Sequence, residues 1–418
     1  MKKLLLAVFL ISNFINSQEI INDTLQTTRQ NLDEVIVKGI RAKFSSPISY
    51  TNVSEEDLKS KNLGQDLPIL LNFLPSVVTT SDAGAGIGYT GIRVRGVSPQ
   101  STNITINGIP FNDAESMGTY WVNLPDFTSS IESLQVQRGV GTSTNGSGAF
   151  GASINILTDV ISDQPYAEIS SSFGSYNTLK NTIKFSTGKI NNHFELSGRL
   201  SKIDSDGYVD RAYSDLKSYF IQGTYTNGNR LIKALSFSGY EKGYQSWYGL
   251  TMDQVQENRR QNPYTYENEI DDYKQDHFQL HWNEKISNYL SFNLGLNYTD
   301  GRGYYEQYRE DDDIKTYGGI VASDRNSNGD ETGTTDLIRR RWLDNDFYVL
   351  NTSFNYVKNK IDLTISSSYS SYIGNHYGEV IWARSLSNTG KIRDRYYEGL
   401  GEKKDLSFFT KLLYFINE

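Results

Sequence analysis

Few side chains in this sequence are spaced as they would be in a metal site. Four oxygen-bearing residues alternate along one hydrophilic stretch, as at the start of a calcium-binding loop: Asp324, Asn326, Asn328 and Asp330. The twelfth position of such a loop normally carries a bidentate glutamate, but here it is Thr335. The sequence therefore predicts no complete metal site, and this incomplete calcium loop is the candidate that remains.

The residues that catalysis requires are also sparse. The chain has 4 His and no Cys, which excludes disulfides, cysteine-bound metals and a thiol nucleophile. It contains no H-E-x-x-H motif and no nucleophile elbow. We therefore predict that the protein is not an enzyme, and we assign no catalytic residue and no cofactor.

Two short segments, residues 81–89 and 113–121, combine glycines with aromatic and acidic side chains, a composition that suits a ligand-binding surface. Their candidate ligand contacts are Asp82, Tyr89, Glu115, Tyr120 and Trp121. The same side chains would equally suit packing inside a domain. The sequence leaves both interpretations open.

The N-terminus has the pattern of an export signal. Lys2 and Lys3 precede an apolar run at residues 4–11, which is too short to span a bilayer and is followed by the small residue Ser17. We therefore predict a signal peptide at residues 1–17.

Three glycines spell the dinucleotide-binding pattern G-x-G-x-x-G, namely Gly146, Gly148 and Gly151. A helix should follow such a pattern, but residues 152–157 read as a strand, and an exported chain meets little nicotinamide cofactor. We therefore interpret these glycines as a turn.

The second half of the chain alternates apolar and polar residues, as a strand with two different faces does. Aromatic residues make up 13% of the sequence although its mean hydropathy is −0.52, a combination that suits membrane strands with apolar outer and polar inner faces. Ten strands are predicted, mostly of the length that a tilted membrane strand needs: 166–173, 178–187, 193–203, 217–226, 231–243, 274–284, 289–301, 346–357, 361–373 and 405–416.

The connections between these strands alternate between short and long. The predicted long connections are residues 204–216, 244–273, 302–345 and 375–404. Bacterial outer-membrane barrels have short periplasmic turns and long extracellular loops, whereas a soluble β-sandwich would not place all its long loops at one end. This alternation favours a barrel over a sandwich.

The first half carries an ordered set of segments that identifies a family. The segments are NLDEVIVKG (31–39), IRVRG (92–96), INGIP (106–110), IESLQVQRG (131–139) and GSGAFGASINI (146–156). Together they resemble the plug domain of TonB-dependent outer-membrane receptors. Physically they read as short Val- and Ile-rich strands joined by glycine turns, with Asn107 and Gly108 as a type I′ hairpin turn.

The resemblance implies a mainly β fold, with a small α+β plug followed by antiparallel transmembrane barrel strands. We expect a flexible leader with the TonB box at residues 18–34, the plug at 35–160 and the barrel at 165–418. Ten strands are fewer than the 22 of a barrel that surrounds a plug. We therefore expect a truncated barrel, the N-terminal part of such a receptor.

The resemblance also implies roles for individual residues. Residues 33–37 resemble the TonB box of Bacteroidetes-type receptors, which comprises Asp33, Glu34, Val35, Ile36 and Val37. Such a short β-forming segment could add a strand to a partner's sheet edge, and it could equally be the plug's own first strand. Arg95 and Arg138 occupy motif positions at which family arginines pair with barrel glutamates, so the resemblance implies that they lock the plug to the barrel. The alternative for each is a solvated arginine at the surface.

The implied function is TonB-dependent uptake of a scarce ligand across the outer membrane. A ferric siderophore or similar iron chelate is the first expectation, and a glycan, cobalamin or heme are the alternatives. A non-transporting fragment or a secreted β-rich binding protein is the alternative of another class. The expected partners are TonB with its inner-membrane complex, the outer membrane and a small extracellular ligand. The net charge of −8 argues against nucleic acid.

Overall fold

The computed structural model describes residues 41–42, 47–140 and 150–416. The predicted signal peptide, leader and TonB box therefore lie outside the described residues, as do Gly146 and Gly148. None of the helices within these ranges is long and apolar enough to cross a membrane.

The first domain, which we call the plug, is built on a mixed five-stranded sheet with the order β1-β6-β7-β4-β5. Its strands are β1 (Ser49–Ser54), β4 (Thr102–Ile106), β5 (Ile109–Pro110), β6 (Ile131–Arg138) and β7 (Ala152–Thr158). Strands β4 and β7 are parallel and the other pairs are antiparallel. Strand β1 lies at an edge, so its one neighbour is β6.

Short elements surround this sheet. They are the hairpin of β2 (Val77–Ser81) and β3 (Thr90–Val94), the helices α3 (Glu55–Lys59) and α4 (Leu67–Leu70), and the 3₁₀ turns η1 (Pro99–Ser101), η2 (Trp121–Asn123) and η3 (Phe127–Ser130). The Val- and Ile-rich strands supply the core, since side chains such as Ile104, Leu134 and Ile154 are almost fully buried. Asn107 and Gly108 have φ angles of 54° and 80°, which confirms the predicted I′ type turn between β4 and β5.

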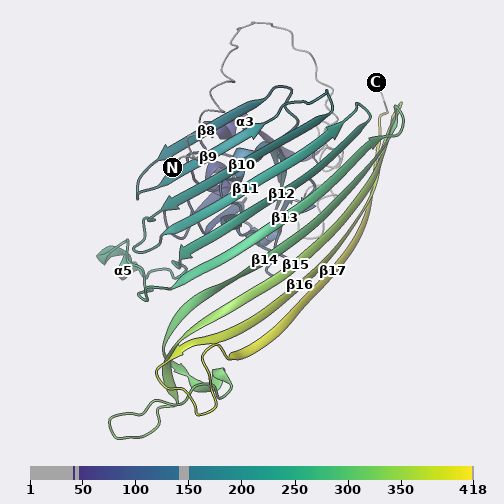
Figure 1. Ribbon diagram of the computed structural model, residues 1–418. Helices are drawn as coiled ribbons and strands as arrows, with labels where there is room; N and C mark the ends of the chain where they lie inside the picture. The colour runs from purple at the N-terminus through teal and green to yellow at the C-terminus, as the bar shows by residue number, and fades with distance from the viewer. Residues whose placement is uncertain (1–40, 43–46, 141–149, 417–418) are drawn as a thin grey trace, which may run out of the picture. The chain divides into compact units, whose positions relative to one another are not determined.

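The second domain is a ten-stranded antiparallel sheet in which every strand pairs with its neighbours in sequence. Figure 1 shows these strands side by side from β8 to β17. Its strands are β8 (Tyr166–Phe173), β9 (Leu179–Ser186), β10 (Phe194–Ser205), β11 (Ser214–Thr226), β12 (Arg230–Tyr244), β13 (Ile270–Lys285), β14 (Leu290–Asp313), β15 (Thr334–Lys358), β16 (Ile361–Ala383) and β17 (Arg395–Tyr414). All ten predicted strands are present, and the short helix α5 (Met252–Glu257) lies in the connection before β13.

The last four strands are longer than the sequence predicted. Most of the residues assigned to the long loops 302–345 and 375–404 belong to extensions of β14 to β17, so those loop boundaries were wrong. The prediction followed apolar alternation, which fades where the strands carry charged and aromatic residues. Pairs such as Tyr304 and Trp342, with ring centroids 4.6 Å apart, continue the sheet there instead.

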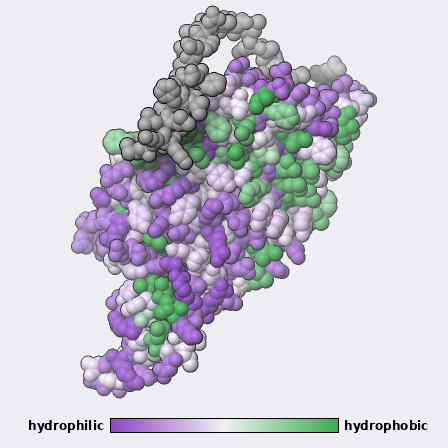
Figure 2. Space-filling model, in the orientation of Figure 1, coloured by the Kyte–Doolittle hydropathy of each residue, from purple (hydrophilic) through white to green (hydrophobic). Residues whose placement is uncertain are grey.

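The sheet is apolar on its exposed face and polar on its inner face. Along β13, Phe278, Leu280 and Trp282 are exposed, whereas His277 and His281 are buried. This inversion of the usual burial pattern is expected of strands that face lipid outside and a plugged lumen inside. Figure 2 shows hydrophobic side chains gathered along the upper right of the molecule, while its lower end is mainly hydrophilic.

The plug ends at Thr158 and the ten-stranded sheet begins at Tyr166. The predicted division between residues 160 and 165 falls in this connection. One close contact between the domains depends on Gly239 of β12, because a Cβ atom there would overlap the carbonyl oxygen of Asn123 in η2.

We expect the Gly239→Ala substitution to loosen the plug, since the added methyl group would push the main chain of η2 away from the sheet. Overpacking of this kind typically costs about 1–3 kcal/mol. The thermal midpoint should fall and protease cleavage within the plug should accelerate. Gly223→Ala on β11 is the matched control, because a Cβ at Gly223 meets no atom within 4 Å. Equal behaviour of the two variants would contradict the prediction.

Candidate ligand-binding site and plug anchor

A cavity of about 530 Å³ lies where the plug meets the extended strands of the sheet. Its aromatic lining includes Tyr89, Phe111, Tyr120, Trp247, Tyr273, Tyr304, Tyr305, Trp342 and Tyr397. Its acidic lining consists of Asp113, Glu115, Glu241 and Asp271, and Arg341 and His376 carry the basic groups. An aromatic cavity with a few charged groups is typical of a small-molecule site.

The cavity brings together three of the five predicted ligand contacts. Tyr89, Glu115 and Tyr120 line it. Trp121 is 3% exposed and packs in the plug core, so packing accounts for this residue. Asp82 is exposed and does not line the cavity. The roles of all five in ligand binding stay predictions.

Glu115 joins the plug segment of residues 113–121 to the sheet. Its Oε2 atom accepts hydrogen bonds from Tyr372 Oη at 3.1 Å and from His376 Nε2 at 2.7 Å. Within the loop, Asp113 Oδ1 accepts from the backbone N–H groups of Glu115 and Ser116. A ligand that displaces Glu115 would therefore disturb both domains.

Tyr89 makes the second contact between the plug and the cavity wall. Its hydroxyl group hydrogen-bonds to Asp271 Oδ2 and lies 3.4 Å from Glu241 Oε1. Burial raises the pKa of Tyr89 well above its ordinary value, and the charges of Asp271 and Glu241 raise it further. Tyr89 is therefore a hydrogen-bond donor at neutral pH. Its ring also contacts Trp247 edge to face, with centroids 5.4 Å apart.

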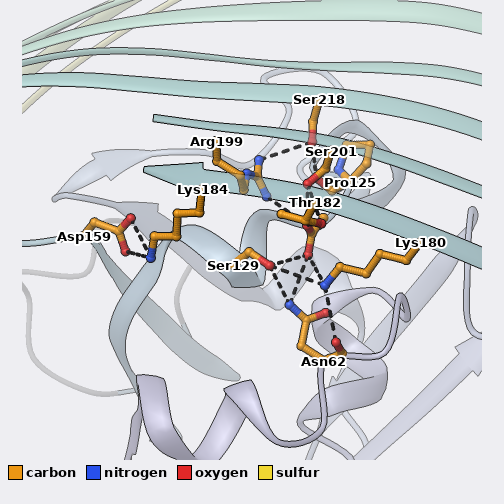
Figure 3. A network of polar contacts seen from close by, with 11 residues as sticks. Asn62, Pro125, Ser129, Asp159, Lys180, Thr182, Lys184, Arg199, Ser201 and Ser218 are labelled. Atoms are coloured by element: carbon orange, nitrogen blue, oxygen red, sulfur yellow. Dashed lines mark hydrogen bonds and ion pairs between the residues drawn. The ribbon is translucent and has the colours of Figure 1, made fainter. Parts of the chain in front are cut away.

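A buried ion cluster, which we call the anchor, joins the plug to the first strands of the sheet. Asp126 lies between η2 and η3 of the plug, with Lys180 Nζ of β9 at 2.8 Å from Oδ1 and Arg199 Nη1 of β10 at 3.7 Å from Oδ2. The side chains of all three are at most 2% exposed. Figure 3 shows Lys180 and Arg199 reaching from the sheet into this network beside Thr182 and Ser201. The hydroxyl groups of Thr182 and Ser201 also donate to Asp126 Oδ2.

A second carboxylate supports the anchor. Asp159, just after β7, forms an ion pair with Lys184 of β9 at 3.0 Å. The backbone carbonyl oxygen of Asp159 accepts hydrogen bonds from Gln222 Nε2 at 3.0 Å and Lys233 Nζ at 3.2 Å. Plug carboxylates and sheet cations thus meet along β9 to β12.

The predicted lock residues lie elsewhere in the plug. The guanidinium group of Arg138 donates to Pro75 O at 3.1 Å and to Thr51 Oγ1 at 2.9 Å, while its buried Nη2 atom has no hydrogen-bond partner among the described residues. Burial lowers the pKa of Arg138, and neighbouring Arg95 lowers it further. Arg95 is exposed, with a φ of 54°. Neither arginine forms an ion pair within the described part of the chain, so the lock role of Arg95 and Arg138 stays a prediction.

The calcium candidate is a turn whose oxygen atoms already have partners. Asp324 accepts from Thr335, Ser385 and Arg384. Asn326 Oδ1 accepts from the backbone N–H groups of Asn328 and Asp330. Across the described residues, no three His, Cys, Asp or Glu side chains are grouped as a metal site.

The anchor and two carboxylates of the cavity, Glu241 and Asp271, were not predicted from the sequence. Lys180 and Arg199 stand among Ser and Thr on the inner faces of their strands, and a long cation at such a position is a signal for a buried partner. No feature of the sequence indicated that Glu241 and Asp271 line a cavity, because their surroundings depend on how the strand ends pair and on where Tyr89 lies.

Residues 42–153 match the TonB-dependent receptor plug domain family. The chain has the plug and barrel strands of a TonB-dependent receptor. The receptor lies in the outer membrane, in agreement with the exposed apolar face of its strands.

Two curated relatives are similar to parts of this receptor. The vitamin B12 transporter BtuB of Vibrio vulnificus is 28% identical over 214 residues, which are 50% of this chain and 33% of the relative. The ferric enterobactin receptor PirA of Pseudomonas aeruginosa is 24% identical over 57% of this chain and 33% of the relative. The chain thus aligns with about a third of these curated relatives.

The fold is similar to solved receptors. The structure of the ferric-catecholate import receptor Fiu from Escherichia coli matches with a TM-score of 0.63 and 14% identity, over 92% of this chain and 56% of that one. The structure of the copper transporter OprC matches with a TM-score of 0.64 and 12% identity, over 88% and 53% of the two chains. At these identities the likeness concerns the fold.

We expect Asp126→Asn to release the plug from the first strands, because two buried cations would lose their counter-ion. Removing one partner of a buried pair costs about 3–5 kcal/mol. Urea should then unfold or extract the plug at a lower concentration. The control is Asp204→Asn, which removes an exposed ion pair with Lys202 and should have little effect.

The same variant should change the response to acid. Burial alone would raise the pKa of Asp126, but Arg199 and Lys180 outweigh it and hold this pKa well below its usual value. A depressed folded-state pKa gives stability that is present above the unfolded pKa, about 3.9, and is lost as the pH falls through the folded value. The difference in the free energy of unfolding between wild type and Asp126→Asn should have its full size at neutral pH and should shrink only below about pH 4.

Asp66 should give the opposite pH dependence. It is 3% exposed, its Oδ2 atom accepts from Thr90 Oγ1 at 2.9 Å, and burial raises its pKa to about 8. A raised folded-state pKa makes the contribution of a carboxyl group to stability fall as the pH rises from its unfolded value of about 3.9 to about 8. Asp66→Asn should therefore gain thermal stability relative to wild type as the pH rises. Exposed Asp253→Asn is the control, and parallel curves for wild type and Asp66→Asn would contradict this expectation.

Proposed function

We propose that this receptor takes up a ferric siderophore or similar iron chelate in a TonB-dependent manner. The observation that carries the proposal is the cavity, which is lined by the plug and by the extended strands together. A ligand bound there touches both domains at once. Binding could therefore be communicated to the plug through Glu115 and Tyr89.

The relatives support iron chelates as the ligand class. Relatives named after such a ligand include the ferric enterobactin receptor PirA of Pseudomonas aeruginosa and the ferrienterobactin receptor of Escherichia coli. The structure of the ferric preacinetobactin receptor BauA of Acinetobacter baumannii has a similar fold, with a TM-score of 0.60. The aromatic lining of the cavity suits the flat or apolar body of an organic chelate.

TonB is the proposed partner, with residues 33–37 as the TonB box in a leader at residues 18–34. The anchor supports the need for such a partner. A plug fixed by buried ion pairs at Asp126 and Asp159 requires external work to move, and the outer membrane has no energy source of its own. On this proposal the plug occupies residues 35–160 and the barrel strands 165–418.

We expect Trp247→Ala to weaken the binding of a ferric chelate by about tenfold, because the substitution removes a ring that contacts both Tyr89 and Tyr305. Binding would be measured by retention of radioactive iron supplied as ferric hydroxamate and catecholate complexes. Trp382→Ala is the control, since Trp382 is partly exposed and does not line the cavity. If wild type retains none of the chelates, the proposed iron function is wrong.

Cobalamin is the second candidate, because the vitamin B12 transporter BtuB matches half of this chain. Cyanocobalamin is therefore included in the same binding series. Tight binding of cyanocobalamin without binding of any ferric chelate would assign the cavity to corrinoids.

A further inference from the structure

The floor of the cavity, formed by Tyr89, Glu241 and Asp271, has an unusual electrostatic composition. Glu241 is 2% exposed and Asp271 is half-buried, and both face the cavity. Neither forms an ion pair with a Lys, Arg or His among the described residues. Buried carboxylates without a counter-ion are costly, so such a pair calls for an explanation.

Tyr89 satisfies only one of the two carboxylates. A phenol group has a single proton to donate, and the shorter contact of Tyr89 is with Asp271. Its distance of 3.4 Å to Glu241 Oε1 is long for an O–H···O hydrogen bond. Glu241 Oε2 accepts no hydrogen bond from the described residues. Glu241 is therefore a buried and effectively unpartnered acceptor at the cavity wall.

The other charged groups of the cavity have partners of their own. Asp113 accepts two backbone N–H groups of its loop, and Glu115 pairs with His376. The guanidinium group of Arg341 donates to Tyr397 Oη at 3.1 Å and lies over the rings of Tyr305 and Tyr397. Arg341 keeps its positive charge and is held by these rings, whereas the negative charge of the cavity that has no cation beside it lies at the floor.

The wall beside the floor also suits a cation. Trp247 contacts Tyr89 on one side and Tyr305 on the other, with centroids 5.4 and 5.6 Å apart. Aromatic faces attract ammonium and guanidinium groups, and more strongly where water is excluded.

We infer that Tyr89, Glu241 and Asp271 form a receptor for a positively charged group of the ligand, so that the chelate taken up carries a protonated amine or guanidine. This inference rests on the proposed function and names its substrate class. Glu241 and Asp271 accept from the cation, and Tyr89 orients Asp271 toward it. Polyanionic chelates such as ferric tricatecholates place negative charge against the same carboxylates and are disfavoured.

The test is a series of ligands that differ in charge and share one metal-binding core. Ferrioxamine B is a ferric trihydroxamate with a terminal primary amine; acetylation of the amine makes the complex neutral, and succinylation makes it anionic. Quenching of the fluorescence of Trp247 and Trp342 in the purified protein reports binding. We expect the amine complex to bind about tenfold more tightly than the acetylated one, as a close ion pair of about 1.4 kcal/mol would give. The succinylated complex should bind most weakly.

The double variant Glu241→Gln with Asp271→Asn separates recognition of charge from recognition of shape. It should bind the amine and acetylated complexes with nearly equal affinity, whereas its affinity for the acetylated complex should match that of wild type. Asp272→Asn is the control, because Asp272 is the next residue of β13 and does not line the cavity. That variant should keep the full preference for the amine.

The outcomes distinguish this inference from the proposed function. Binding of all three complexes with no dependence on charge, or tighter binding of the succinylated complex or of a ferric tricatecholate, overturns the cation site and leaves chelate uptake standing. A charge preference that persists in the double variant also overturns it. Absence of binding by every ferric chelate overturns the proposed function, and the inference with it.

Discussion

The buried ion cluster of Asp126, Lys180 and Arg199 is the interaction on which the joining of plug and sheet depends. Charges this deeply buried stabilise a structure only when they are paired. The plug supplies the carboxylate and the sheet supplies the two cations, so neither domain could bury its charged groups without the other. Plug and sheet are therefore folded as one interdependent unit along β9 to β12. The cavity is lined by residues of both domains, so its shape depends on the relative position that the anchor helps to determine.

The anchor and the cavity floor are two polar sites with different roles in this receptor. In the anchor the carboxylate of Asp126 is fully partnered, since Lys180 and Arg199 pair with it and the hydroxyl groups of Thr182 and Ser201 donate to it. The cavity floor is incompletely paired, since Glu241 has neither a cation nor a short hydrogen bond. In a protein interior, complete pairing favours stability, whereas incomplete pairing costs stability and leaves binding energy for a ligand. The same residue types thus serve attachment at one site and recognition at the other.

Much of the fold followed from the sequence because it depends on local pattern. All ten sheet strands were predicted from period-two alternation, and the turn at Asn107 and Gly108 from its residue types. The ends of β14 to β17 were missed because Tyr, Trp and charged residues pair there, so the strands lack apolar alternation.

The candidate site was predicted only in part. Among the candidate ligand contacts, Tyr89, Glu115 and Tyr120 line the cavity, whereas Trp121 lies in the core. Composition could indicate a ligand surface, but which side of each loop faces the cavity depends on tertiary packing. Asp126 was missed for the same reason, because its partners lie more than fifty residues away.

The place of β1 at the edge of the plug sheet has a mechanical consequence. Its hydrogen bonds run to β6 alone, from the pair of Ser49 with Arg138 to the pair of Ser54 with Ser133. Strands β6, β7 and β4 are each flanked on both sides. A tension applied to the chain before Ser49 would first meet the hydrogen bonds of Arg41 and Ala42 to β6 and β7. It would then separate β1 from β6 one residue pair at a time, while the interior strands are held on both sides. The mechanical resistance of the plug sheet is therefore uneven. Its edge strand β1 is held on one side, and it is also the strand nearest to the N-terminal end, from which the chain would be pulled.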